Sequence, residues 1–214
     1  VFIIGDSHSE DLVNAVFEAK LTDSIDFSSY YIPLRCGVLF VDKKEDREHR
    51  KFTCKAWRNF EDEFFDLVSV ADEVWVVADW EHADFTYIRE SVLNLKMLND
   101  AVLVFGKKDF GFIYAGIYKN FPKHLWSKAI SRANRSLTNP STAYINRFVA
   151  GEVKSAGAQF IDTQFLLCGD AEVCPNYVGG ELFSYDGSHL TPFGATFLGN
   201  KLKSTFNLIE NSGE

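Results

Sequence analysis

The fold is decided by residues 1–8, VFIIGDSH. Residues 1–4 form an unbroken apolar run, which predicts a strand buried on both faces of a sheet. Gly5 permits a sharp turn, and the polar residues after it are good helix N-caps ahead of apolar residues at helical spacing. Ser7 is therefore expected at the carboxyl end of a strand and at the positive end of a helix, where open α/β sheets bind their ligands. A helix cap with no chemical role is the alternative for this serine.

Similar apolar runs recur along the chain and alternate with segments of helical periodicity. This alternation predicts an α/β fold: a three-layer α/β/α sandwich with a mostly parallel five-stranded sheet. No internal repeat or linker interrupts the 214 residues, so we expect a single domain over 1–214. The expected strands are 1–4, 28–34, 73–78, 101–105 and 158–161, and the expected helices are 8–20, 88–98, 123–135, 140–156 and 192–202, with a further aromatic helix face at 57–68.

Composition excludes some classes of function. The net charge of −8 argues against a nucleic-acid partner, because nucleic-acid-binding proteins gather Lys and Arg on one face. No apolar run reaches the length of about 18 residues that a membrane helix needs. No targeting segment is visible, but Val1 stands inside the first predicted strand, so we expect a mature or trimmed part of a longer chain.

The segment YDGSHL at 185–190 supplies the groups that a nucleophilic serine needs. A serine hydroxyl is a poor nucleophile until a base takes its proton, and histidine suits that task. A carboxylate that binds the other ring nitrogen fixes the tautomer, and Asp186 is close enough in sequence to fold back onto the ring of His189. We therefore predict a catalytic triad of Ser7, His189 and Asp186, which only the fold can bring together.

The four cysteines indicate which kind of cellular compartment, oxidising or reducing, the protein occupies. No Cys-x-x-Cys pair or His-rich neighbour accompanies them, so we expect no metal site. Of the three possible pairings, closeness in the chain favours Cys168–Cys174 and then Cys36–Cys54. Such disulfides indicate an oxidising compartment. Four reduced and mostly buried cysteines are the alternative.

Both motifs resemble blocks of the SGNH/GDSL hydrolase superfamily. The sequence GDS at 5–7 resembles its nucleophile block, and DGSH at 186–189 resembles its Asp-x-x-His block near the C-terminus. The chain is most similar to the SGNH domain attached to bacterial membrane-bound acyltransferases that O-acetylate cell-surface polysaccharides. The features that carry this closer resemblance are GDSH at 5–8, VVADW at 76–80, the loop between Cys168 and Cys174, and DGSHLTPFGA at 186–195.

The resemblance implies a flavodoxin-like α/β domain and acyl-ester chemistry through an acyl-Ser7 intermediate, with His189 as base and then acid and with no cofactor. It implies an acylated carbohydrate or another acyl donor as partner, a membrane acyltransferase domain N-terminal in the same chain, and a periplasmic location. The reaction would transfer an O-acetyl group to a bacterial surface polysaccharide or remove one. The alternatives are a weakly active or inactive carbohydrate-binding module on the same fold, and a lipase-like GDSL enzyme.

The chain departs from the superfamily after the third predicted strand. Where the superfamily often has Gly-x-Asn-Asp, whose asparagine stabilises the oxyanion, this chain has Ala-Asp-Trp-Glu at 78–81. A carboxylate beside a developing negative charge is unfavourable, so Asp79 is not expected to replace the asparagine. The expected oxyanion donors are the backbone N–H groups of Ser7 and Gly37. Loss of one such donor typically costs about 10²–10³ in rate.

Substrate contacts are expected from residues around the nucleophile. His8 follows Ser7, Trp80 and His82 follow the third predicted strand, and the aromatic loop 107–122 is expected to cross the carboxyl edge of the sheet. Its rings, together with Trp80, offer faces that stack on sugars, although they could equally serve only to cover the sheet edge. An open cleft with a preference for short acyl chains is expected. The rings concerned are Phe110, Phe112, Tyr114 and Tyr118.

Overall fold

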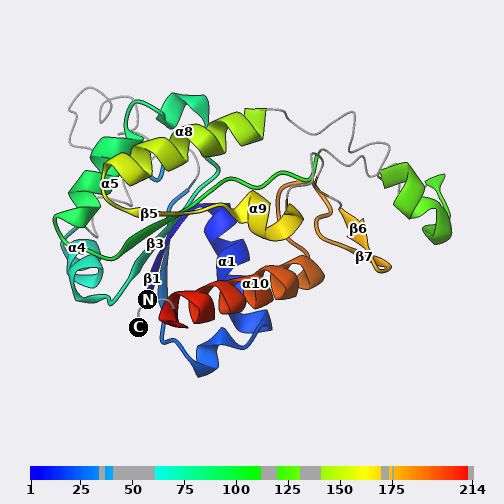
Figure 1. Ribbon diagram of the computed structural model, residues 1–214, viewed down its shortest axis with the longest axis horizontal. Helices are drawn as coiled ribbons and strands as arrows, with labels where there is room; N and C mark the ends of the chain where they lie inside the picture. Colours follow the sequence, from blue (N-terminus) through cyan, green and yellow to red (C-terminus); the bar gives the residue numbers. More distant parts are fainter. Residues whose placement is uncertain are drawn as a thin grey trace. The chain divides into compact units, whose positions relative to one another are not determined.

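The computed structural model describes residues 1–33, 37–40, 61–111, 120–130, 141–169, 174 and 176–211. Within this part of the chain, five strands form a sheet in the order β2-β1-β3-β4-β5, and every neighbouring pair is parallel. Figure 1 shows the sheet with its flanking helices. The predicted α/β fold with a mostly parallel five-stranded sheet is confirmed. The strands are β1 (Phe2–Gly5), β2 (Ser28–Tyr31), β3 (Val74–Val77), β4 (Val102–Phe105) and β5 (Gln159–Ile161).

Helices occupy the segments between the strands, as the alternation predicts. In the described residues, none of them is both long enough and apolar enough to cross a membrane. The short helix α9 and an antiparallel hairpin of β6 and β7 were not predicted from the sequence. The helices are α1 (Ser7–Glu18), α4 (Glu61–Val70), α5 (Ile88–Lys96), α8 (Ser141–Ser155), α9 (Thr163–Cys168) and α10 (Pro192–Asn211); the hairpin strands are β6 (Tyr177–Val178) and β7 (Glu181–Leu182); and single 3₁₀ turns lie at Leu21–Asp23, His82–Asp84 and Lys123–Leu125.

The chain forms two compact units that interleave in sequence. The first unit comprises Val1–Glu10, Ile25–Lys107 and Ala143–Asp162, and it contains the five-stranded sheet. The second comprises Asp11–Ser24, Lys108–Thr142 and Thr163–Glu214, and it contains α9, α10 and the hairpin. The expected single domain over 1–214 stays a prediction.

The core of the first unit lies between one face of the sheet and three helices, α4, α5 and α8. Alternate side chains of β1, β3 and β4 pack there, because successive residues of a strand point to opposite faces. The residues between them are buried as well, as expected for apolar strands of a parallel sheet. The side chains on the first face are Phe2, Ile4, Val74, Val76, Val102 and Val104, and those on the second are Ile3, Trp75, Val77, Leu103 and Phe105.

An aromatic cluster around Phe183 holds the second unit together. Phe183 is buried, stacks on Phe110 and makes edge-to-face contacts with Phe193 and Phe197 of α10. Such ring pairs stabilise a core beyond the area that they bury. The cluster therefore fixes the backbone just before the segment that carries Asp186.

Candidate active site

Ser7 is the first residue of α1 and follows β1 after a single residue, Asp6. The Asp6 carboxylate is buried, and its Oδ1 accepts the backbone N–H of His8 at 2.9 Å. Its Oδ2 accepts the backbone N–H of Asp79, just beyond β3, at 2.8 Å. The turn that presents Ser7 is thereby tied to the end of the neighbouring strand.

Gly5 is required at the end of β1 by close approach rather than by an unusual backbone conformation. A Cβ at this position would collide with the carbonyl oxygen of Val77 in β3 and would lie 2.7 Å from the Cβ of Ser9 in α1. Gly5 is absent from the residues with positive φ, so the freedom to turn, which the sequence suggested as its purpose, is not what the fold uses. Any larger residue would push β3 or α1 away from the Ser7 turn.

Asp79, in the segment 78–81 where the superfamily often carries its asparagine, is paired with a cation. Its Oδ1 lies 2.5 Å from the Nζ of Lys107, which follows β4 by two positions, and 3.8 Å from the Nε2 of His8. Sequence analysis did not single out Lys107. The available signal was a lysine directly after a buried parallel strand, at the carboxyl edge of the sheet where ligands bind.

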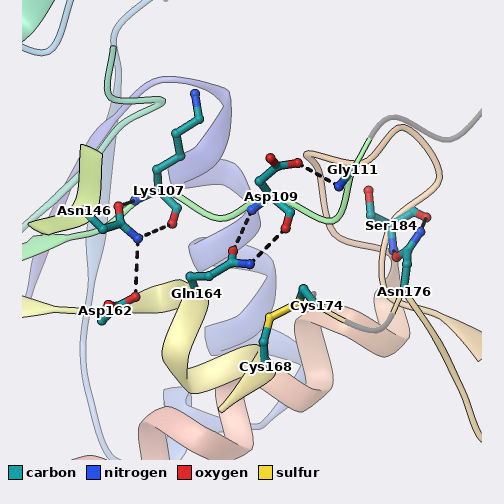
Figure 2. The surroundings of a disulfide bond; sticks show 10 residues. All are labelled: Lys107, Asp109, Gly111, Asn146, Asp162, Gln164, Cys168, Cys174, Asn176 and Ser184. Carbon is teal, nitrogen blue, oxygen red and sulfur yellow. Dashed lines mark hydrogen bonds between the residues drawn. A yellow bond between two sulfur atoms is a disulfide. The ribbon is translucent and has the colours of Figure 1, made fainter. Parts of the chain in front are cut away.

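The segment that follows β4 is held by amide side chains (Figure 2). Asn146 of α8 accepts the N–H of Lys107 and donates to its C=O, both at 2.8 Å. Gln164 of α9 binds Asp109 in the same way, at 2.7 and 3.0 Å. The backbone N–H and C=O groups of Lys107 and of Asp109 thus make hydrogen bonds like those that a neighbouring strand would supply.

A buried ion pair anchors the turn that carries His189. Lys108 Nζ lies 2.7 Å from Asp11 Oδ2, and the two side chains are only 3% and 6% exposed. The other carboxylate oxygen of Asp11 accepts the N–H of Leu190 at 2.9 Å. Phe110 donates its N–H to the carbonyl of Gly187 at 2.9 Å, so the turn is held at two points.

Asp186 and His189 form a close pair within this turn. Asp186 Oδ2 lies 2.6 Å from Nδ1 of His189, while Oδ1 accepts the N–H groups of Ser188 and His189, both at 2.8 Å. The pair thus engages Nδ1 of the ring, the nitrogen that an orienting carboxylate binds in a serine triad. Burial alone would raise the pKa of the Asp186 carboxyl, but the hydrogen bonds from His189 and Ser188 and the charge of His189 hold that pKa far below its ordinary value.

Asp186 is also held by a hydrogen bond from Ser184, whose own backbone is fixed by Asn176. Ser184 Oγ donates to Asp186 Oδ1 at 3.1 Å and accepts the N–H of Gly187 at 2.8 Å. The backbone of Ser184 makes both of its hydrogen bonds with the side-chain amide of Asn176, at 2.7 Å each. The disulfide Cys168–Cys174, which was predicted, joins the end of α9 to the segment leading to Asn176, with a Cα–Cα distance of 5.0 Å (Figure 2).

The structure brings together only part of the predicted triad within one unit. Asp186 and His189 lie together in the second unit, whereas Ser7 lies in the first.

Gly37 has a φ of 67°, a left-handed conformation that favours glycine. Its use as an oxyanion donor stays a prediction. Cys36 and Cys54 lie outside the described residues, and so does their predicted pairing.

The expected aromatic contacts need correction. Trp80 is 2% exposed and donates its indole N–H to the carbonyl of Phe105, and Phe110 is fully buried, so neither ring offers a face to a sugar. His8 is also buried. His82 is exposed and stacks on Tyr144, a half-exposed ring on α8 that sequence analysis missed. Phe112, Tyr114 and Tyr118 lie outside the described residues.

Within the described residues, no group of three or more His, Cys, Asp or Glu side chains could hold a metal ion. The first unit offers a serine at a helix start, and the second unit offers an aspartate–histidine pair. These are the groups that nucleophilic acyl transfer requires.

Comparison with known proteins identifies relatives of the chain. The model of a family described as "SGNH domain (fused to AT3 domains)" matches residues 1–204. The periplasmic domain of a lipopolysaccharide acetyltransferase from Salmonella ser. Paratyphi A has a TM-score of 0.67 at 18% identity, over 96% of this chain and 82% of that one. A catalytic mutant of Axe2, an acetylxylan esterase from Geobacillus stearothermophilus, has a TM-score of 0.52 at 12% identity, over 95% and 91% of the two chains. No curated protein matches the sequence. At these identities, the two solved structures show a shared fold.

Proposed function

This chain belongs to the family of SGNH domains that are fused to AT3 domains, and from that premise we propose that it breaks and forms acyl esters through an acyl-Ser7 intermediate. The observation that carries the proposal is the Asp186–His189 pair, with 2.6 Å between the carboxylate and the ring. A carboxylate held by two backbone N–H groups fixes both the orientation of the imidazole and its tautomer. The second ring nitrogen, Nε2, is the proposed base for a serine hydroxyl.

In the first half-reaction, Oγ of Ser7 attacks the carbonyl carbon of an acyl ester while Nε2 of His189 takes the hydroxyl proton. The tetrahedral intermediate carries its negative charge on the former carbonyl oxygen. It collapses by breaking the bond to the alkoxide, which takes the proton from His189 and leaves as an alcohol. A water molecule or a sugar hydroxyl then attacks the acyl-Ser7 ester in the same manner and restores the serine.

The role of Ser7 as nucleophile is supported by its place at the start of α1. Because α1 begins at Ser7, the positive end of its dipole favours negative charge at the serine. The N–H groups of Ser7 and Gly37 are the proposed oxyanion donors.

For the substrate, we propose O-acetyl groups on a bacterial surface polysaccharide, handled outside the cytoplasm together with a membrane acyltransferase domain. The fusion named in the family description supports the second domain. The lipopolysaccharide acetyltransferase and the acetylxylan esterase share the fold, and both are named for acetyl groups on carbohydrates. The disulfide Cys168–Cys174 fits an oxidising compartment.

Two measurements test this function. A fluorophosphonate probe should label the protein at Ser7 with loss of fluoride, as found by peptide mapping, because only an activated serine reacts with it. Hydrolysis of p-nitrophenyl acetate should exceed that of the butyrate and octanoate esters. A protein that neither reacts with the probe nor hydrolyses acetate would contradict the proposal and favour the carbohydrate-binding alternative, which the loss of the superfamily asparagine also favours. A preference for octanoate would favour a lipase-like enzyme.

A further inference from the structure

Asp79 lies in contact with both residues that flank Ser7. Its backbone N–H is bound by Asp6 at 2.8 Å, and its carboxylate lies 3.8 Å from the ring of His8. The Asp79 side chain is only 22% exposed, so water screens its charge weakly. An ionised carboxylate here would oppose the negative charge that acyl transfer develops on the substrate at Ser7.

Lys107 is positioned to cancel that charge. Its Nζ lies 2.5 Å from Asp79 Oδ1 and 3.4 Å from the carbonyl oxygen of Trp80, and its side chain is 16% exposed. The side-chain amide of Asn146 binds both the N–H and the C=O of Lys107, so the backbone from which the lysine side chain extends is held in place (Figure 2). Preorganised charge of this kind needs no rearrangement when the reaction begins.

We propose that Lys107 is a positioning residue that neutralises Asp79 and thereby allows negative charge to develop on the acyl group at Ser7. The inference rests on the proposed acyl-ester chemistry and concerns the electrostatics of that same site. Lys107 acts through Asp79 rather than by contact with the substrate. The harm done by removing the lysine should therefore disappear when the carboxylate is removed as well.

The test is a cycle of Lys107→Met, Asp79→Asn and the double variant, with p-nitrophenyl acetate as substrate. Lys107→Met should lower kcat about 10- to 100-fold with little change in KM, because the unpaired carboxylate opposes the transition state only. Asp79→Asn keeps the backbone N–H that binds Asp6 and should stay within about threefold of the wild type. The double variant should regain nearly the rate of Asp79→Asn, and Lys107→Arg should retain most of the wild-type kcat.

Several outcomes would overturn the inference. A double variant as slow as Lys107→Met would mean that the lysine acts on something other than Asp79. A tenfold or greater loss in Asp79→Asn alone would give the carboxylate a positive role, and this arm does not require Lys107→Met to fold. Lys96→Met removes a partly buried lysine at the end of α5; it is the matched control and should leave kcat unchanged.

The fluorophosphonate probe separates this inference from the proposed function. If the wild type is labelled at Ser7 and Lys107→Met is labelled at the same rate, only the role of Lys107 is overturned. If the wild type is neither labelled nor active, both proposals are overturned. Thermal unfolding of each variant shows whether a lost rate reflects a lost fold.

Discussion

The turn at Asp6 in the first unit and the turn at Asp186 in the second begin with the same hydrogen bond but use the second carboxylate oxygen differently. In each, an aspartate Oδ1 accepts the backbone N–H two residues later: Asp6 from His8 and Asp186 from Ser188. The second oxygen of Asp6 binds the backbone of Asp79, whereas that of Asp186 binds the ring of His189. The first turn is buried, and in the second the Asp186 and His189 side chains are about half exposed. The partner of the second oxygen thus makes one aspartate an anchor of the fold and the other an orienting group.

The largest expected effect on the rate comes from removing the hydroxyl of Ser7. Ser7→Ala should lower hydrolysis of p-nitrophenyl acetate about 10⁴- to 10⁶-fold, because no nucleophile remains. Thermal unfolding should change little, since Ser7 is only partly buried. Ser9→Ala, in which a nearby hydroxyl that binds the carbonyl of Asp6 is lost, is the matched control and should keep most of the rate. Near-wild-type turnover by Ser7→Ala would contradict the triad.

Changing each aspartate to asparagine should affect a different property: the rate for Asp186 and the stability for Asp6. Asp186→Asn should lower kcat about 10⁴-fold, because an amide NH₂ facing Nδ1 favours the wrong tautomer of His189. Asp6→Asn should act chiefly on stability and cost about 1–3 kcal/mol, since one buried N–H loses its acceptor. Steady-state kinetics and urea unfolding of both variants test this. Equal losses of rate in the two variants would show that the turns do not differ as described.

The anchor behind the second turn is the Lys108–Asp11 pair. Lys108→Met leaves a buried carboxylate without its cation and should lower the free energy of unfolding by about 3–5 kcal/mol. Adding Asp11→Asn to this variant should recover part of the loss. Lys203→Met, an exposed lysine on α10, serves as the control and should have little effect. Urea unfolding measures all three variants, and a loss below about 1 kcal/mol in Lys108→Met would show that the pair is dispensable.

The smallest effect is expected from pH. The folded pKa of Asp186 is lowered, so its contribution to stability is present above the ordinary aspartate value of about 3.9 and is lost as the pH falls through the folded value. The stability gap between the wild type and Asp186→Asn should therefore narrow below about pH 4. The gap should be small, because the carboxylate is 54% exposed. Unfolding curves at several pH values test this, with exposed Asp66→Asn as control, and a gap that widens in acid would contradict it.

Local features of this chain were predictable from its sequence. Buried parallel strands need continuous apolar runs, so β1, β3 and β4 were placed to within about two residues. The Asp186–His189 pair could also be predicted from the sequence, because a spacing of three residues lets the carboxylate fold back onto the ring. The hairpin at 177–182 and helix α9 were missed, since neither is long enough to show a periodicity.

The sequence by itself determined the α/β fold class and which side chains can carry proton and acyl transfer, because both depend on residue type and short spacings. Only the tertiary structure decided which charges are paired. The consecutive lysines Lys107 and Lys108 bind Asp79 and Asp11, which lie far apart in the chain. Burial was likewise decided at this level: the sequence left open whether Trp80 and Phe110 offer faces to a sugar, and in the structure both rings are buried. The physical reason is that pairing and burial depend on contacts between distant segments, which no local pattern encodes.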